Sequence, residues 1–303
     1  MIRPTHRPAR PASYRVCFLS SIVLALGISQ AVLPATGGRS FLWKASNSRG
    51  SLYLVGSVHM LSKDYYPLSP ALEAAFKDSD LLVEEADLGD MLAPESAIQT
   101  LARGTLPEGQ TLEKVLSPST YALVRKRVAA LGLPPEMLAS FKPWMIAITL
   151  EALEWQKAGF DAELGLDKHF YDRAKSNGKP VQGLETVEYQ ISRFDEMTMA
   201  QQDHLLAESL KDVDSERSAV SQVADAWKNG DAAAVERIVL RDLKQDPVMY
   251  QRLLVERNRT WLPKLEALVG RSRPFVVVGA AHLVGPDGLL TMLKAKGYQV
   301  EQQ

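Results

Sequence analysis

The chain has 303 residues, of which 46% are hydrophobic and 23% are charged, and this composition is typical of a globular protein and excludes a disordered or collagen-like chain. The formal net charge of −1 gives no electrostatic reason to expect nucleic-acid binding. The single cysteine excludes an intramolecular disulfide framework and a Cys-rich zinc site.

The N-terminus has the pattern of an export signal. Four arginines and no acid fall within residues 1–15, and an apolar run follows at 16–28. A basic segment, a short apolar run and the small residues around Ala31 together predict a secretory signal peptide over residues 1–31. An uncleaved membrane anchor is the alternative, but the run is short for a full span. We therefore expect a mature chain from residue 32 in the periplasm or outside the cell.

Strand-like and helix-like segments then alternate. Turn residues separate the β-prone runs at 41–43 and 51–55, which predicts a hairpin. A Ser-Pro pair at 69–70 has the pattern of a helix start. A short buried strand is expected at 81–83, and the sequence from about 91 to 177 is mostly helical.

The second half of the chain continues this alternation. A short strand is expected at 179–184, and its early proline indicates an edge position. A helical block covers about 186–269. The run at 274–278 is the clearest strand, and a helix and a last strand at 298–300 follow it.

Strand-forming segments at the two ends of the chain therefore bracket a large helical middle. This order predicts an α/β or α+β fold with a mixed central sheet built from N- and C-terminal segments. We expect a single domain over 32–303, with helical insertions at about 91–177 and 186–269.

Two copies of one short motif stand far apart in the chain. Each is an apolar run followed by Gly-x-x-His, first from Gly56 to His59 and again from Gly279 to His282. Ligands bind beyond the carboxyl ends of strands in open α/β sheets, so both imidazoles would face one site if the strands are neighbours. Two neutral imidazoles with carboxylates suit Zn²⁺, Mn²⁺ or Co²⁺. The alternative is two loop histidines that form only local hydrogen bonds.

Three glutamates also follow predicted strands. Glu84 and Glu85 end the run at 81–83, where a buried acid is costly unless it is solvated, paired or bound to a metal. Glu185 follows the strand at 179–184, although the helix dipole also favours an acid at a helix N-terminus. Glu185 and one of the adjacent pair are the candidates for metal ligand and general base.

Helical spacing adds an arginine and an aspartate. Arg257 falls on an apolar helix face with Leu254 and Trp261, so its guanidinium needs a carboxylate or an anionic substrate. A structural ion pair would satisfy it nearly as well. Asp167 lies on a second apolar helix face, where it would orient a histidine or pair with a structural arginine.

Together these motifs resemble the TraB/GumN family, which is related to the TIKI metalloproteases. The matching segments, in chain order, are residues 54–61, 82–87, 165–167, 181–186 with Gln190, 256–258 and 278–289. They are individually short, but they cover nearly all of the mature chain in one order. More distant likeness extends to haem-binding lipoproteins and erythromycin-esterase-like proteins, so a shared fold does not fix the chemistry.

The resemblance implies a role for each candidate residue. One divalent metal ion, Mn²⁺, Co²⁺ or Zn²⁺, would be held by His59, Glu85 and His282, with Glu84 as the alternative to Glu85. Glu185 would accept a proton from the metal-bound water. Arg257, followed by Asn258 as in the family, would stabilise the oxyanion or a substrate carboxylate.

We therefore expect a metal-dependent, peptidase-like hydrolase that acts on a peptide or small-molecule substrate outside the cytoplasm. It would bind neither nucleic acid nor, after signal cleavage, a membrane. One alternative is a non-catalytic protein that binds haem or another small molecule in the same cleft. Another is an export-accessory scaffold with a vestigial site, which the complete set of site residues disfavours.

Overall fold

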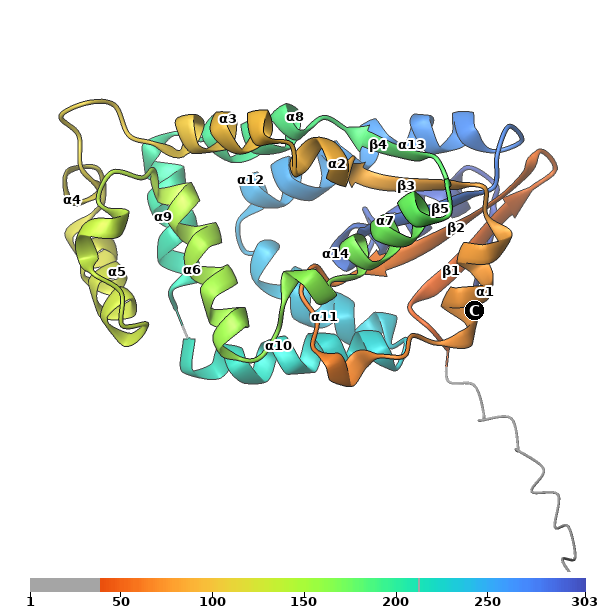
Figure 1. The fold of residues 1–303 in the computed structure, drawn as a ribbon, viewed down its shortest axis with the longest axis horizontal. Coiled ribbons are helices and arrows are strands. Elements are labelled where there is room, and N and C mark those ends of the chain that lie inside the picture. Colours follow the sequence, from red (N-terminus) through yellow and green to blue (C-terminus); the bar gives the residue numbers. More distant parts are fainter. Residues whose placement is uncertain (1–38, 212) are drawn as a thin grey trace, which may run out of the picture. The chain divides into compact units, whose positions relative to one another are not determined.

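The computed structural model describes residues 39–211 and 213–303. Within these residues, six strands form one mixed sheet in the order β4-β3-β5-β2-β1-β6 (Figure 1). The strands are β1 (Leu42–Asn47), β2 (Gly50–Ser57), β3 (Leu81–Ala86), β4 (Val181–Glu185), β5 (Pro274–Gly279) and β6 (Gln299–Gln302). The predicted mixed sheet is confirmed, whereas the export signal predicted at 1–31 lies outside the described residues.

Helices fill the long segments between the strands, as predicted. Those before β4 are α1 (Pro70–Asp78), α2 (Leu88–Met91), α3 (Pro94–Gly104), α4 (Leu112–Val115), α5 (Pro118–Ala130), α6 (Pro143–Lys157) and α7 (Leu166–Ser176). Those after β4 are α8 (Val187–Asp195), α9 (Met199–Ser209), α10 (Val213–Lys228), α11 (Ala232–Leu243), α12 (Pro247–Tyr250), α13 (Glu256–Leu268), α14 (Ala280–Leu283) and α15 (Leu289–Ala295). The predicted start of α1 is confirmed, because the Ser69 hydroxyl accepts a hydrogen bond from the Leu72 amide.

The four strands β4, β3, β5 and β2 are parallel to one another, so their carboxyl ends meet at one edge of the sheet. Val55 of β2 lies opposite Val277 of β5, which confirms that the two Gly-x-x-His segments are neighbours. β1 and β2 form the predicted antiparallel hairpin, and β4 is at an edge, as its early proline indicated.

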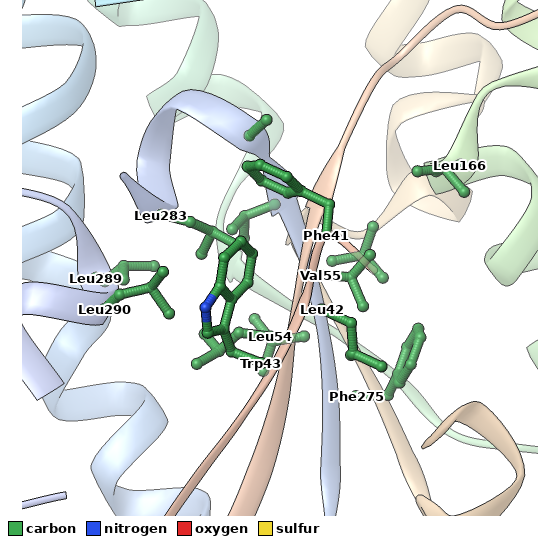
Figure 2. Close-up of a cluster of buried hydrophobic side chains, with 14 of the residues drawn as sticks. Phe41, Leu42, Trp43, Leu54, Val55, Leu166, Phe275, Leu283, Leu289 and Leu290 are labelled. Carbon is green, nitrogen blue, oxygen red and sulfur yellow. The ribbon is translucent and has the colours of Figure 1, made fainter. Parts of the chain in front are cut away.

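Apolar side chains cover both faces of the sheet. β5 is buried along its whole length, which suits a central strand with parallel neighbours. On one face the ring of Phe275 lies 5.3 Å from that of Phe76 in α1 and 4.7 Å from that of Phe170 in α7. Figure 2 shows Leu283 of α14 beside Trp43 on the other side of the strands. This packing fixes the sheet edge at which the site is built.

The helices between β3 and β4, together with α9, form a second apolar cluster. Its buried members are Leu112, Leu116, Val124, Val128, Leu138, Ile146, Ala147, Leu150, Leu206 and Leu210. Helix α6 supplies three of them and lies beside α9 (Figure 1). Among residues 39–211 and 213–303, no helix combines the length and apolar character needed to cross a membrane.

Candidate functional site

The strand ends bring the predicted site residues to one edge of the sheet. His59 lies two residues beyond β2, Glu85 is the last residue but one of β3, and Glu185 is the final residue of β4. His282 lies in α14, directly after β5. Arg257 comes from α13, 25 residues before His282 in the chain, and hydrogen bonds to it. Parallel pairing therefore gathers residues that are separated by more than 200 positions.

A cavity of about 510 Å³ opens at this edge. His59, Glu85, Arg257 and His282 line it together with residues of α6, α10 and α11. The remaining lining residues are Ser57, Val58, Met60, Ile148, Glu151, Ala152, Trp155, Val223, Val239, Gly279, Ala280 and Ala281. The Trp227 indole of α10 donates a 2.7 Å hydrogen bond to the Gly56 carbonyl, which ties this helix to the end of β2. Most of the wall is apolar, and the charged and imidazole groups other than Glu151 of α6 converge at the sheet edge.

Arg257 connects the two buried glutamates. Its Nη2 lies 2.6 Å from Glu85 Oε2 and 2.6 Å from Glu185 Oε1, and its Nε also donates to Glu185. Its Nη1 donates to the Leu253 carbonyl and to His282 Nε2, at 3.2 and 3.1 Å. The guanidinium thus uses all of its N–H directions within the protein. The predicted need of Arg257 for a carboxylate is met by two of them.

The helix that carries Arg257 is irregular just before it. Residues Gln251–Val255 form a π-helical segment between α12 and α13. Such segments shift the register of the side chains that follow, and they often occur at functional sites. Here the Trp261 ring, one turn after Arg257, lies 4.7 Å from the guanidinium, and its indole donates to Glu185 Oε2. The sequence predicted the helix but not this interruption.

Glu85 and Glu185 both accept hydrogen bonds from Nη2 of Arg257, but their electrostatics differ. Burial alone would raise the pKa of Glu85, but Arg257 and the Gly279 amide, 2.7 Å from its Oε1, hold that pKa far below its ordinary value. Gln190 donates to the other oxygen of Glu85. Burial raises the pKa of Glu185, whose side chain is only 2% exposed and does not line the cavity. Both Glu185 oxygens accept bonds from Arg257 and Trp261, so Glu185 faces its partners and not the cavity.

His282 has a defined tautomer. The Asn258 amide nitrogen donates to the carbonyls of His282 and Asp287, so its oxygen is the acceptor for His282 Nδ1–H at 2.7 Å. Burial lowers the pKa of His282 to about 3, which keeps the imidazole neutral at physiological pH. Its Nε2 therefore offers a lone pair, and in this arrangement that lone pair accepts the bond from Arg257.

His59 is oriented by Asp167. Its Nδ1 lies 2.9 Å from Asp167 Oδ2, to which the Ser57 hydroxyl also donates. The charge of Asp167 raises the pKa of His59 to about 9. The side chain is 64% exposed and lines the cavity. Of the two roles considered for Asp167, the structure shows the orientation of a histidine, and no arginine of the described segments pairs with it.

A glycine allows this contact between His59 and Asp167. Gly165 precedes α7, and a side-chain carbon placed there would lie 2.1 Å from the His59 carbonyl oxygen. Only glycine lets the start of α7 approach the loop after β2 so closely. Asp167, two residues later, is thereby brought to the imidazole.

Glu84 points away from the cavity, because successive side chains of a strand alternate between faces. One of its oxygens accepts a hydrogen bond from the Leu88 amide, and the other has no partner in the described part of the chain. Burial raises its pKa to about 8. Of the two glutamates left open by the sequence, Glu85 is the one that lines the cavity.

The donor atoms around Gly279 fit a divalent metal in chemical type. A side-chain carbon added there would lie 3.2 Å from Glu85 Oε1, 3.5 Å from His59 Nε2 and 3.6 Å from His282 Cδ2, so the three side chains surround one small space. Both imidazoles have Nδ1 held by an acceptor, which is how metal-binding histidines are commonly oriented.

The arrangement is nevertheless not that of a formed metal site. Within residues 39–211 and 213–303, no group of three or more His, Cys, Asp or Glu side chains is arranged to hold a metal ion. Arg257 instead contacts both Glu85 and His282 Nε2, and a metal would have to displace the proton that Asp167 favours on His59. The metal ligands assigned from the sequence stay a prediction.

Several residues of the site were not expected. Ser57 and Trp261 bond to Asp167 and Glu185, and Glu151 and Ile148 face the cavity from α6. The sequence of α6 is that of a helix with two packed faces, because its apolar residues surround the whole helix. The sequence did not indicate which second surface it covers.

The TraB/PrgY/gumN family matches residues 41–302 of this chain. This match confirms the resemblance found from the short motifs. It covers both Gly-x-x-His segments and every candidate site residue. No solved structure matches the chain.

Individual relatives fall into two groups. The uncharacterized protein YbaP of Escherichia coli is 29% identical over 267 residues, which cover 86% of this chain and 96% of the relative. The metalloprotease TIKI1 of Danio rerio is 23% identical over 321 residues, which cover 88% of this chain and 64% of the relative. The metalloprotease TIKI2 of the same organism is 22% identical, with 86% and 60% covered.

Proposed function

The chain belongs to the TraB/PrgY/gumN family, and we propose that it is a hydrolase that cleaves peptide substrates in the cavity at the sheet edge. One observation carries this proposal. Two imidazoles from neighbouring parallel strands, each with Nδ1 held by an acceptor, share that cavity with a carboxylate. Such a set of groups supports hydrolysis, and the relatives named as metalloproteases favour peptides as the substrate class.

A divalent metal ion, Mn²⁺, Co²⁺ or Zn²⁺, would be held by His59, Glu85 and His282. When bound, it would supply a Lewis acid and an activated water. Asp167 and Asn258 fix the orientation of the two imidazoles. Gly279 leaves the space between the three side chains open.

Arg257 and Glu185 act together in this proposal. Arg257 balances the charge of Glu85 beside the reacting groups and holds its carboxylate in place. Glu185 was predicted as a general base, but its contacts suit a positioning residue that fixes the guanidinium. We therefore assign it that role. A purely structural role would leave the metal affinity unchanged, whereas a positioning role makes the affinity and the rate depend on Glu185.

The proposed place of action is the periplasm or the cell exterior. The basic and apolar segments of residues 1–31 support export, and the mature chain would contain no cysteine, because Cys17 lies within the signal. Such a chain cannot form wrong disulfides in an oxidising compartment.

A second candidate is a protein that binds haem or another small molecule without turnover. The observation that favours it is the exposed His59 imidazole in a cavity with apolar walls, which is a suitable environment for a flat apolar ligand. Titration with hemin tests it directly. A Soret shift that saturates at one equivalent and is lost in His59→Ala would favour this candidate over hydrolysis.

The proposed hydrolysis is tested with a proteome-derived peptide mixture and mass spectrometry of the products. The protein is purified from the periplasm and assayed after chelation, and again after addition of Mn²⁺, Co²⁺ or Zn²⁺. We expect new cleavage products that need one of the metals and vanish in His282→Ala. Absence of products under all four conditions, or products that persist unchanged in His282→Ala, contradicts the proposal.

A further inference from the structure

One wall of the cavity is a single face of helix α6. Ile148, Glu151, Ala152 and Trp155 line the cavity, and their spacing of three, four and seven residues places them on one side of the helix. Val223 of α10 and Val239 of α11 extend this wall. Glu151 is the one acidic side chain that these helices contribute to the described lining.

The cavity face of α6 is less buried than the opposite face, although Trp155 at its end also packs against Phe160 of the main core. Ile146, Ala147 and Leu150, on the other side of the helix, are buried in the second apolar cluster. Ile148, in contrast, is 41% exposed although it is a large apolar residue. An exposed apolar side chain that lines a concave surface is typical of a ligand-binding wall.

Glu151 has no partner in the described structure. It makes no hydrogen bond and no ion pair there, its exposed side chain lines the cavity, and the charge of His59 is the one nearby cationic influence on it among the described residues. The cations that share its cavity are already engaged, since His59 bonds to Asp167 and Arg257 directs its N–H groups at protein acceptors. Trp155 lies one helical turn away on the same face. A carboxylate beside an aromatic ring is a common arrangement for holding a cation.

We propose that Glu151 recognises a positively charged nitrogen group of the substrate while an adjacent apolar side chain packs against Ile148 and Val239. The cation is either the free ammonium of a peptide N-terminus or the side chain of a lysine or arginine. This inference rests on the proposed peptide-cleaving function. It assigns α6 as the element that selects among peptides, and the sheet edge as the element that carries the chemistry.

The test uses fluorescently labelled synthetic hexapeptides in two pairs. The first pair is N-acetylated and differs only by lysine against norleucine at one position. The second pair contains no lysine or arginine and differs only by a free against an acetylated N-terminus. Dissociation constants at pH 7 are measured by anisotropy for the wild type, for Glu151→Gln, and for Glu95→Gln. Glu95 is an exposed glutamate of α3 outside the cavity, so its variant controls for the loss of one negative charge.

We expect the wild type to bind the cationic member of at least one pair about tenfold more tightly, a difference of about 1.4 kcal/mol. The pair that discriminates identifies the source of the cation. Glu151→Gln should remove the discrimination by weakening the cationic member alone, and Glu95→Gln should retain it. Equal binding of both members of both pairs by the wild type overturns the inference, as does discrimination that survives in Glu151→Gln.

Cleavage of the same peptides separates this inference from the proposed function. Discriminating binding without any cleavage supports the role of Glu151 and removes the hydrolase proposal. If both members of each pair bind with equal affinity and are cleaved at equal rates, the hydrolase proposal is supported and the role of Glu151 is removed. If none of the peptides binds or is cleaved, both are wrong.

Discussion

Nη1 of Arg257 lies 3.1 Å from Nε2 of His282, and this nitrogen is the one that the tautomer of His282 leaves free for a ligand. The same guanidinium holds Glu85 at 2.6 Å. Arg257 is therefore the internal cation of a site that contains two buried carboxylates. In the absence of such a cation, burying both charges would cost several kcal/mol.

The first prediction concerns Arg257→Lys, which looks conservative. Lysine keeps the charge but replaces a planar fork with a point charge, so it cannot serve Glu85, Glu185 and His282 together. We expect the free energy of unfolding in urea to fall by about 3 kcal/mol, as for other broken buried pairs. Arg259→Lys, two residues later and exposed, is the matched control and should be neutral. Equal stability of the two variants would show that the fork geometry contributes nothing.

The second prediction separates the adjacent glutamates. Burial raises the pKa of Glu84 from 4.5 to about 8, so its protonated form is the one that the fold favours. This contribution to stability is complete below about pH 4.5 and is lost as the pH rises through 8. The free energy of unfolding of the wild type should therefore fall by up to about 1.4 kcal/mol per pH unit between pH 5 and 8.

Glu84→Gln should remove the Glu84 share of this slope, because a neutral amide resembles the protonated acid, and should leave the share that His59 contributes above about pH 6.5. Urea unfolding of both proteins from pH 5 to 8.5 measures the difference. The same variant should leave metal binding and cleavage unchanged, since Glu84 does not line the cavity. Parallel pH profiles for Glu84→Gln and the wild type would refute the assignment of a protonated Glu84.

Much of the fold follows from local patterns in the sequence. The hairpin, the Ser-Pro helix start at 69–70, the edge position of β4 and the pairing of the two Gly-x-x-His strands are all confirmed. The reason is physical, because apolar periodicity, turn residues and caps act over a few residues. The gathering of His59, Glu85 and His282 at one edge then follows from parallel pairing.

Other features depend on contacts that no local pattern specifies. The bond of Arg257 to both glutamates and to His282 results from the π-helical segment and from the distance between α13 and the sheet. The role of α6 as a cavity wall depends on how the helical insertion folds back over the sheet edge. The sequence assigned Glu185 to the reacting centre, whereas its oxygens face Arg257 and Trp261.

The third prediction concerns Gly165→Ala. The added methyl group would lie 2.1 Å from the His59 carbonyl oxygen, which is backbone and cannot rotate away. The start of α7 must move, and the bond between Asp167 and His59 should lengthen or break. We expect a loss of about 1–3 kcal/mol in unfolding free energy, as for other overpacked sites. Loss of the hydrogen bond between His59 and Asp167 should appear in NMR titrations as a His59 pKa nearer 6.5. An unchanged His59 pKa would contradict this prediction.

The fourth prediction concerns export. The mature protein recovered from the periplasm should begin near Val32, after removal of residues 1–31. N-terminal sequencing or intact mass spectrometry of the periplasmic fraction checks this. An intact N-terminus in a soluble cytoplasmic fraction would overturn the proposed location.

Mass spectrometry after dialysis against Mn²⁺, Co²⁺ or Zn²⁺ measures the metal content of the wild type, His59→Ala, His282→Ala and Glu185→Gln, and this content decides whether the two Gly-x-x-His motifs hold a metal. We expect about one ion per wild-type chain and at least tenfold weaker binding in each histidine variant. Glu185→Gln should keep more of the metal than either histidine variant. Its metal affinity should still fall measurably, because Glu185 holds Arg257 in place beside Glu85. If both histidine variants retain the full metal content of the wild type, the paired motifs are not metal ligands and the proposed hydrolytic site is wrong.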